Sequence, residues 1–527
     1  MTALKLAARI VTTIGAIVTL TSCGGGDSTA PVTPPPPVPV TPTAGLKIVI
    51  GAGVSDTIEA QPAQALIVEV RKADGSLSRG TVVRFEVQGS LDSLRRGEPT
   101  MAACVVTAPQ CGSQFGYAFA TDSTDADGRA RVLVRLGRVA GRGVIRVRVP
   151  DFGFEDSATY TVKPGLPAIV RTGVMSLGLD IGASSTLRGI VSDRAGNTRT
   201  EATALSAGPG TSLTVDATTN TLTGKDLGTQ WAYVKFGALS DSVNVRVVPT
   251  GRLVVWSPGL YSIKFVNVNG LGVAKVMATG VSSDFGTFPR FDATRSRLTW
   301  HNGQSNYGGP SNVVVSLDTA TGARRELLSG TVFSTVLLTR LQQDGTLLVI
   351  GRRSVDAPSA PISLWKVAAD NTVTLGVALP DLGAAYGGAD VSPDGSRVAY
   401  LGTTASFTQE LRIVNVSTGT VNILDASARS PRFSPQGDRV AYLIPPQSGY
   451  FGSLDGAPAV INADGTGKKP LGGGVMSPGL SWSPDAAYLV GRNSDYGLGS
   501  GLRLLRVSDG ISVLLALGDD YYQPDWR

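Results

Sequence analysis

The stretch DVSPDGSRVAYL, from Asp390 to Leu401, decides the fold of the second half of the chain. It combines a short apolar segment, a turn begun by Pro393 and closed by Gly395, and a second segment of alternating apolar residues, which together are typical of a β-hairpin. Two close copies follow, RFSPQGDRVAYL from Arg432 and LSWSPDAAYLVG from Leu480. Because a single hairpin cannot bury its own apolar face, the copies must pack against one another. The pattern therefore predicts a repeat structure.

Weaker copies extend the repeat toward both ends of this region. They read FDATRSRLTW from Phe291, LQQDGTLLVIG from Leu341 and YQPDWR from Tyr522. From Phe291 to Val391 is 100 residues, or two units of 50, and the next intervals between equivalent positions are 42, 49 and 44 residues. This spacing fits four short strands per unit, which is the spacing of a β-propeller.

A strand that runs into a glycine turn also recurs in each unit, as in LRIVNVSTG from Leu411, and we assign it as the third strand. Counting in this way gives five complete units. A sixth forms if YQPDWR, from Tyr522, supplies the inner strand that is missing before the segment Leu253–Gly270. The ring would then close with both ends of the region in one unit.

These repeats resemble the TolB-type six-bladed β-propeller, whose blades carry a similar F-S-P-D-G-x-x-[IVL]-A-[FY] phrase. The resemblance covers residues 251–527. The serine, proline, aspartate and glycine of the phrase build turns, so the resemblance implies an architecture and says little about chemistry. By analogy with TolB-like propellers that dock onto partners, it implies a binding role.

The start of the chain has the features of a secretion signal. Lys5 and Arg9 precede an apolar run from Ile10 to Leu20, and Thr21, Ser22 and Cys23 follow. Eleven residues are too few to span a bilayer. The segment resembles a bacterial lipoprotein signal with its lipobox, which implies a signal peptide at 1–22 and lipidation of Cys23; the alternative is a frayed helix with a chance cysteine. Gly24 in place of aspartate implies passage to the outer membrane.

Residues 23–45 form a linker in which the stretch from Pro31 to Pro42 is rich in proline. Polyproline II rises about 3.1 Å per residue, so this part would extend by roughly 40 Å. The linker would hold the folded part of the protein away from the lipid.

Period-two alternation predicts two β-sandwich domains between the linker and the propeller, at 46–164 and 165–250. The first contains the Asp74-Gly75 turn, Gly80 before the next strand, and the DGRA turn at 127–130. These features resemble bacterial immunoglobulin-like domains of the invasin and intimin type, and the second segment is similar to the same superfamily. The fold class is thus all-β: two immunoglobulin-like sandwiches followed by a six-bladed TolB-like propeller. The resemblance implies a stalk between anchor and head.

Besides Cys23, the only cysteines are Cys104 and Cys111, which we expect in a long loop between strands. In an oxidising compartment this spacing predicts a local disulfide that pins the loop. A redox role is the alternative, although the pair lacks the C-x-x-C form.

The charge balance is mild, with 47 basic and 41 acidic residues, and removal of the signal leaves 45 and 41. This balance does not predict nucleic-acid binding. Arginines do alternate with apolar residues along one predicted sandwich face, at Arg129, Arg131, Arg135, Arg146 and Arg148. The face either contacts an anionic surface polymer or is an ordinary solvated sheet surface.

The inventory for catalysis is small, because the chain contains one histidine, His301, which we expect in a loop. A triad hydrolase would need a G-x-S-x-G elbow, which is absent, and a zinc site would need several histidines. We therefore expect a protein that is not an enzyme and that has no metal site and no cofactor. A carbohydrate-active enzyme that works with carboxylates remains an alternative.

The loops that join second and third strands are long, and they carry aromatic residues among glycine, asparagine and glutamine. The candidates for partner binding are Tyr307, Tyr450, Phe451 and Tyr496. Exposed aromatics on a rigid scaffold suit protein hot spots or sugar stacking, whereas packing against the propeller rim is the structural alternative.

The sequence therefore predicts a lipid-anchored scaffold protein of the bacterial cell envelope, on the periplasmic or surface face of the outer membrane. Its propeller would bind a protein or polysaccharide of the envelope. The alternative from another class is a surface adhesin that binds through its immunoglobulin-like modules.

Overall fold

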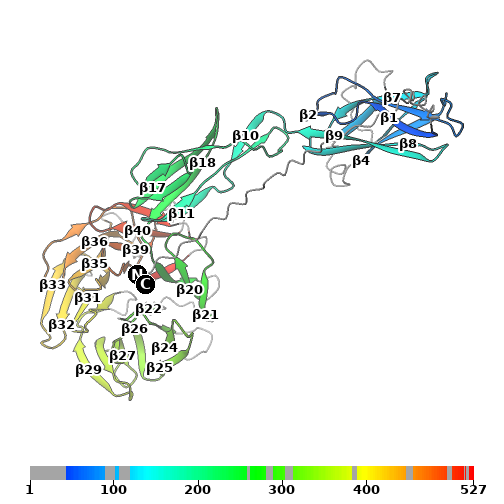
Figure 1. Ribbon diagram of the computed structural model, residues 1–527. Coiled ribbons are helices and arrows are strands. Elements are labelled where there is room, and N and C mark those ends of the chain that lie inside the picture. The colour runs from blue at the N-terminus through cyan, green and yellow to red at the C-terminus, as the bar shows by residue number, and fades with distance from the viewer. Residues whose placement is uncertain are drawn as a thin grey trace, which may run out of the picture. The chain divides into compact units, whose positions relative to one another are not determined.

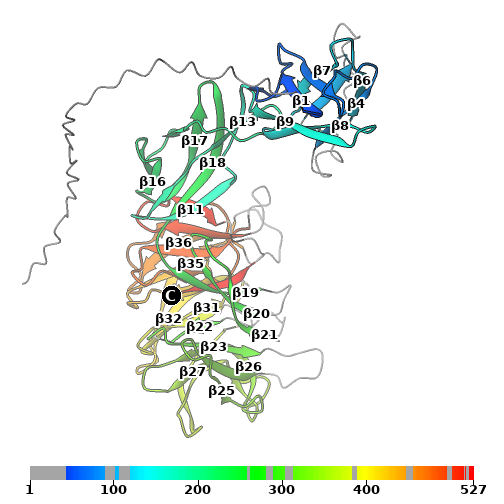
Figure 2. The ribbon, with the colours of Figure 1, turned by 45° about the vertical axis from the view of Figure 1, so that its right-hand side comes forward.

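The computed structural model describes residues 43–88, 101–105, 119–257, 262–279, 289–292, 294–302, 312–382, 388–406, 408–446, 455–494, 501–515, 517 and 521–527. Every regular element in these ranges is a β-strand (Figures 1 and 2). The all-β prediction is therefore confirmed. Over the same ranges, no helix has the length and apolar character that crossing a membrane requires. The chain divides into two compact units, and the boundary between them in the sequence lies between Val162 and Lys163.

The first unit contains two antiparallel sheets, with strand orders β1-β3-β7-β5 and β2-β9-β8-β4-β6. The strands are β1 (Gly45–Ile50), β2 (Ser55–Thr57), β3 (Leu66–Arg71), β4 (Val82–Gln88), β5 (Met101–Val105), β6 (Phe119–Ser123), β7 (Arg129–Leu136), β8 (Gly141–Val149) and β9 (Phe154–Lys163). Leu66, Val68 and Val70 of β3 are fully buried, and so are Ile145 and Val147 of β8. Because side chains alternate between the faces of a strand, this burial places the core on one face of each sheet.

The second unit begins with three small sheets, β10-β13, β11-β18-β17-β14 and β12-β16-β15, around one buried cluster that includes Leu222, Val234 and Val245. The strands are β10 (Pro167–Arg171), β11 (Ser176–Asp180), β12 (Ser184–Thr186), β13 (Ile190–Asp193), β14 (Ala204–Ala207), β15 (Leu213–Asp216), β16 (Thr221–Gly224), β17 (Gly228–Phe236) and β18 (Leu239–Val248). β11 pairs with β18 in parallel, whereas the other pairings described here are antiparallel.

Six four-stranded antiparallel sheets make up the rest of the described chain. The first three contain β19 (Arg252–Ser257), β20 (Ser262–Asn267), β21 (Lys275–Thr279) and β42 (Tyr522–Trp526); β22 (Arg290–Phe291), β23 (Arg297–Asn302), β24 (Val313–Asp318) and β25 (Arg324–Leu328); and β26 (Phe333–Leu341), β27 (Leu347–Arg353), β28 (Ser363–Val367) and β29 (Val373–Ala378). The other three contain β30 (Ala389–Val391), β31 (Arg397–Thr403), β32 (Gln409–Asn415) and β33 (Val421–Asp425); β34 (Arg429–Phe433), β35 (Arg439–Ile444), β36 (Ala457–Asn462) and β37 (Lys469–Pro470); and β38 (Ser481–Trp482), β39 (Tyr488–Arg492), β40 (Leu502–Arg506) and β41 (Ser512–Leu515).

Apolar clusters join these sheets in a ring, which is the architecture of a β-propeller. Each sheet shares a buried cluster with the next one along the chain, and one cluster joins the β38–β41 sheet back to the sheet of β19. β42 pairs antiparallel with β19, with Leu253 opposite Trp526 and Val254 opposite Asp525. This is the pairing that the YQPDWR repeat predicts. The strands β22 and β26 lie toward the centre of the ring and β25 and β29 toward its edge (Figure 1).

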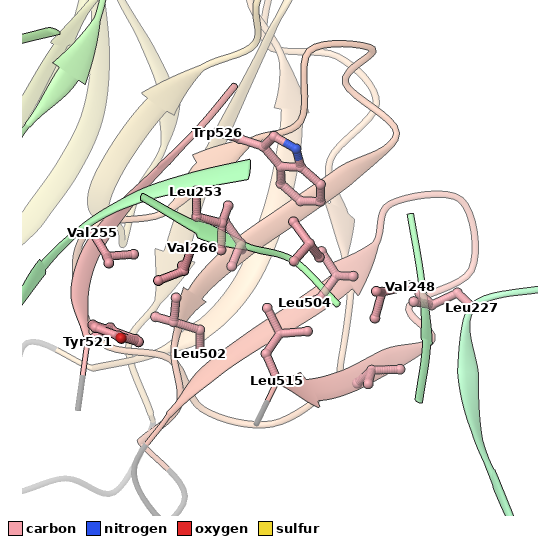
Figure 3. Packing of buried hydrophobic residues seen from close by; sticks show 13 residues of the cluster. Leu227, Val248, Leu253, Val255, Val266, Leu502, Leu504, Leu515, Tyr521 and Trp526 are labelled. Atoms are coloured by element: carbon pink, nitrogen blue, oxygen red, sulfur yellow. The ribbon is translucent and has the colours of Figure 1, made fainter. Parts of the chain in front are cut away.

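One cluster also packs the first part of this unit against the propeller. Leu227 and Val248 come from the part around β17 and β18, and Leu504 and Leu515 come from β40 and β41 (Figure 3). Nearby, the Arg506 guanidinium forms an ion pair with Asp226. The side chain of Asn269 donates a hydrogen bond of 2.9 Å to Asp180 Oδ1. The contact is therefore an apolar core with polar links beside it.

Two placements expected from the sequence are wrong. Cys104 lies in β5, opposite Leu133 of β7, rather than in a loop. His301 lies in β23, opposite Val314 of β24, and is fully buried. Both residues stand in short segments of alternating or apolar residues. Such a segment becomes part of a strand when it pairs with a longer neighbouring strand, and local propensity alone does not predict this pairing.

Candidate binding site on the propeller axis

The site residues proposed from the sequence lie almost entirely outside the described residues. This holds for Tyr307, Tyr450, Phe451 and Tyr496, and also for Cys23 and Cys111. The loop aromatics, the lipidation site and the Cys104–Cys111 disulfide therefore stay predictions. The described residues instead bring together a different set, at the centre of the ring.

Each innermost strand contributes one residue at the same place in its repeat, directly before a buried apolar residue. In chain order these residues are Arg290, Arg340, Asp390, Arg432, Ser481 and Asp525. They come together because consecutive strand residues face opposite sides: the apolar member packs between sheets and its neighbour turns toward the axis. Five of the six carry a charge, which is unusual for residues inside an innermost strand.

The six residues line a cavity of about 120 Å³, together with residues of the hairpin turns that follow these strands. The turn residues are Asp292, Arg295, Pro393, Ser434 and Pro435. The apolar part of the lining is Phe291, Phe433, Trp482 and Trp526. The cavity therefore lies on the face of the ring that carries the hairpin turns.

The carboxylates of the cavity hold neighbouring sheets together. Asp390 forms an ion pair with Arg290, and its Oδ2 accepts a hydrogen bond of 2.8 Å from the backbone nitrogen of Phe433. Asp525 accepts hydrogen bonds of 2.8 Å from the backbone nitrogen of Phe291 and from Ser481 Oγ, one at each oxygen. Every oxygen of both carboxylates is thus engaged.

The third carboxylate of the cavity, Asp292, is engaged within its own turn. Its Oδ1 accepts hydrogen bonds from the backbone nitrogens of Ser296 and Arg297, at 2.9 and 3.1 Å. Its Oδ2 accepts one of 2.9 Å from Thr294 Oγ1. All three carboxylates therefore have a structural role in the described structure.

The guanidinium groups of the cavity are only partly engaged. Arg432 Nε donates to the carbonyl oxygen of Leu480 at 2.7 Å, and Arg340 Nη1 donates to that of Val391 at 2.9 Å. Three N–H groups, at Arg290 Nε, Arg340 Nε and Arg295 Nη1, are buried without a hydrogen-bond partner in the described part of the chain. Since a buried N–H of a cation is costly to leave unpaired, these groups indicate a site for an acceptor from outside.

The charges of the lining leave a small positive excess. Four arginines and three aspartates give a formal charge of +1. Burial lowers the pKa of Arg340 and of Arg295 from the usual arginine value, and the nearby carboxylates of Asp390 and Asp525 respectively oppose that effect. Arginine remains protonated in proteins, so the cavity is a poorly hydrated cationic site with room for one negative charge.

His301 does not belong to this lining. Burial lowers its pKa to about 4, and the positive charge of Arg290 acts in the same direction. Its Nε2 has no hydrogen-bond partner within the described ranges. The imidazole is therefore neutral at neutral pH and packs as part of the second sheet.

The expectation of one arginine-rich sandwich face is wrong, because its residues lie on two different sheets: Arg129, Arg131 and Arg135 on β7, and Arg146 and Arg148 on β8. Arg146 and Arg148 both bind Glu155 on the neighbouring strand, and Arg84 lies 2.6 Å from Glu86. The side chains of Arg146, Arg148 and Glu155 are about two-fifths exposed, so their ion pairs contribute little to stability. The pairing favours the interpretation of an ordinary solvated sheet surface.

The axial cavity was not predicted from the sequence, although the sequence carries two signals of it. The aligned repeats carry charge where an innermost strand is expected to be apolar. In addition, Arg295 stands where three other repeats have glycine, at Gly345, Gly395 and Gly437. Both signals acquire a meaning only when the ring brings the repeats together.

No protein-family model matches the chain, and no curated protein matches it. Among solved structures, TolB from Acinetobacter baumannii is similar, with 14% identity, a TM-score of 0.41, and coverage of 61% of this chain and 82% of that one. A putative TolB from Agrobacterium tumefaciens has 11% identity, a TM-score of 0.36, and coverage of 52% and 92%. An oligogalacturonate lyase in complex with manganese has 13% identity, a TM-score of 0.30, and coverage of 51% and 85%.

The sheets and their ring of apolar clusters thus define a class, the all-β proteins that contain a β-propeller. The similarities concern the fold and not the chemistry of the axial cavity. What the cavity binds has to be argued from its own residues.

Proposed function

We propose that this protein is a lipid-anchored binding and scaffold protein of the bacterial cell envelope, with a six-bladed propeller as its binding head. In this proposal residues 1–22 are a signal peptide and Cys23 is the lipidated residue. The linker at 23–45 and two immunoglobulin-like domains, at 46–164 and 165–250, hold the propeller at 251–527 away from an outer-membrane leaflet. The lipobox-like residues before Cys23 and the proline-rich stretch support the anchoring part.

The observation that carries the binding part is the axial cavity. It combines buried guanidinium N–H groups with three aspartates whose oxygens already accept hydrogen bonds. An acceptor from a partner would complete this hydrogen-bond network. Rigid strands and short turns position the lining, which reduces the entropy cost of binding.

The same contacts weigh against the alternative of a carbohydrate-active enzyme. General acid and base catalysis needs a carboxyl group that is able to exchange its proton with the substrate. Asp390 and Asp525 are tied to Arg290, Ser481 and backbone N–H groups. These contacts favour a structural role for the two carboxylates.

Photo-crosslinking in living cells tests the proposal. A photoreactive amino acid is placed in the full chain at Gln436, an exposed turn residue next to the cavity-lining Pro435. Matched chains carry it at Tyr450 in a predicted binding loop, at Trp231 on β17, or at Arg131 in the first unit. We expect one defined adduct from Gln436, and an adduct from Tyr450 as well if the loops share the partner.

Adducts that form from Arg131 or Trp231 but not from the propeller positions would favour the adhesin alternative. No adduct from any position would contradict a binding role. Anchoring is tested in the same cells, because Cys23→Ala should release the protein from the membrane fraction.

A further inference from the structure

One residue of the axial cavity occupies a backbone conformation that does not suit it. Arg295 has a φ of 57°, and its backbone nitrogen donates to the carbonyl oxygen of Asp292 at 3.0 Å. The same turn bond recurs at Gly395 and Gly437, where φ is 72° and 75°. The left-handed region favours glycine, so an arginine here strains the backbone. Strain of this kind is often retained where a side chain has a function.

The side chain of Arg295 reaches the cavity, where its Nη1 is buried without a partner among the residues described. Arg340 presents a buried, unpaired Nε to the same space. Planar guanidinium groups match the two oxygens of a carboxylate and bind it through paired N–H donors. The chemistry of the lining therefore selects a carboxylate rather than a neutral group.

The size and charge of the cavity limit the ligand. Its volume is about 120 Å³, and an engineered cavity of about 150 Å³ in another protein holds one benzene molecule. A carboxylate on a short aliphatic stem fits that space. The formal charge of the lining is +1, which matches one monoanion.

The rim around the cavity is acidic. Asp344, Asp394 and Asp485 occupy the same position in three turns, and all three are exposed. Burial alone would raise the pKa of Asp394, but hydrogen bonds from Ser392 and Ser396 hold it at about 2, so it stays ionised. A polyanion, with a charge on every unit, would meet this rim unfavourably.

Two arginines near the rim make contacts with the neighbouring sheet. Arg397 lies over the ring of Phe433 and donates to the carbonyl oxygen of Gly437. Arg439 lies over the ring of Trp482 and donates to that of Ala486. Their contacts leave the rim carboxylates as the groups that a ligand would meet around the cavity.

We infer that the axial cavity binds a single acidic side chain of a protein partner, an aspartate or glutamate that basic residues flank in the partner's sequence. This rests on the proposed function, since it names the partner chemistry of the same site. The carboxylate would accept hydrogen bonds from Arg295 and Arg340. The flanking basic residues would face the rim carboxylates.

Isothermal titration of the full chain with blocked synthetic peptides tests the inference. One peptide carries a glutamate between lysines, and its twin carries glutamine instead. We expect the glutamate peptide to bind at least tenfold more tightly, because charge-assisted hydrogen bonds are lost with glutamine. Trigalacturonate and inorganic phosphate, as an acidic sugar fragment and a small anion, should bind more weakly than the glutamate peptide.

The variant Arg295→Gly separates binding from folding. It should weaken binding of the glutamate peptide at least tenfold while raising the unfolding midpoint, because glycine suits this backbone conformation. Ala486→Gly is the matched control: Ala486 has a φ of 55° in the equivalent turn and does not line the cavity. It should leave peptide binding unchanged.

Equal binding of the two peptides would overturn the inference, as would unchanged binding by Arg295→Gly, tighter binding of trigalacturonate or phosphate, or no binding at millimolar concentration. The crosslinking experiment distinguishes this failure from failure of the proposed function. If Arg295→Gly forms the Gln436 adduct as well as the parent chain does, the binding role stands and the carboxylate site falls. If no adduct forms at all, the binding role itself falls.

Discussion

The side-chain oxygen Oδ2 of Asp525 accepts a hydrogen bond of 2.8 Å from the backbone nitrogen of Phe291, across 234 positions of the sequence. Asp390 makes the same kind of contact with the backbone nitrogen of Phe433. Each of the two contacts joins two sheets of the ring. A carboxylate in one innermost strand thus caps an N–H group in another. These two contacts explain why aspartates stand at two places where the repeat leads one to expect apolar residues.

Substitution of Asp525 should weaken the ring. Asp525→Ala leaves the Phe291 N–H group without its acceptor and removes the hydrogen bond from Ser481, so we expect a loss of about 3 kcal/mol in the free energy of unfolding. Urea denaturation measures the change. Asp370→Ala, at an exposed turn carboxylate on the propeller edge, should cost less than about 1 kcal/mol. Equal losses in the two variants would show that the contact between Asp525 and Phe291 contributes no more to the free energy of unfolding than an ordinary turn contact does.

His301 should make stability depend on pH in mildly acidic solution. Its pKa is about 4 in the folded protein and 6.5 as the ordinary value, so below pH 6.5 the unfolded chain takes up a proton that the folded chain does not. Stability therefore falls as the pH drops through this window, by about 2 kcal/mol between pH 7 and pH 5. Urea denaturation at the two pH values measures the loss.

His301→Gln removes this titration, so the difference in unfolding free energy between pH 7 and pH 5 should shrink by most of that amount. A lower stability of the variant at pH 7 does not affect the comparison, because only the change of the unfolding free energy with pH is compared. A slope as steep in the variant as in the parent chain would assign the pH dependence to other groups.

Relief of backbone strain should stabilise the turn at Arg295. Arg295→Gly is expected to raise the free energy of unfolding by about 1 kcal/mol, since its φ of 57° is costly for a residue with a Cβ atom. Thermal unfolding followed by circular dichroism measures the change. A lower midpoint would mean that the guanidinium contributes more to folding than the strain costs.

The second unit should unfold as one body. Leu227 is 3% exposed in a cluster that it shares with β40 and β41 of the propeller. Leu227→Ala should cost about 2 to 4 kcal/mol, because it leaves a cavity in this shared core. Differential scanning calorimetry should show one transition for residues 163–527 in the parent chain and a split or broadened transition in the variant. Two separate transitions in the parent chain would contradict a common core.

The local patterns were predictable from the sequence because short-range chemistry governs them. The alternation of Val398 and Tyr400 and the turn from Pro393 to Gly395 specify a hairpin without reference to any other part of the chain. The pairing of YQPDWR with β19 was predictable because the repeat lacked one strand. The burial of His301 was not predictable, since it depends on which sheets cover β23.

The sequence by itself determined an all-β chain whose second half repeats a strand-turn-strand phrase, because turn residues and period-two alternation act over a few positions. Only the tertiary structure decided that Arg290 meets Asp390, one hundred positions away, and that Arg295 and Arg340 share one cavity. The physical reason is the closure of the ring. It brings one residue of each innermost strand to a common axis, where these side chains are largely buried and their charges need partners within the protein or in a ligand.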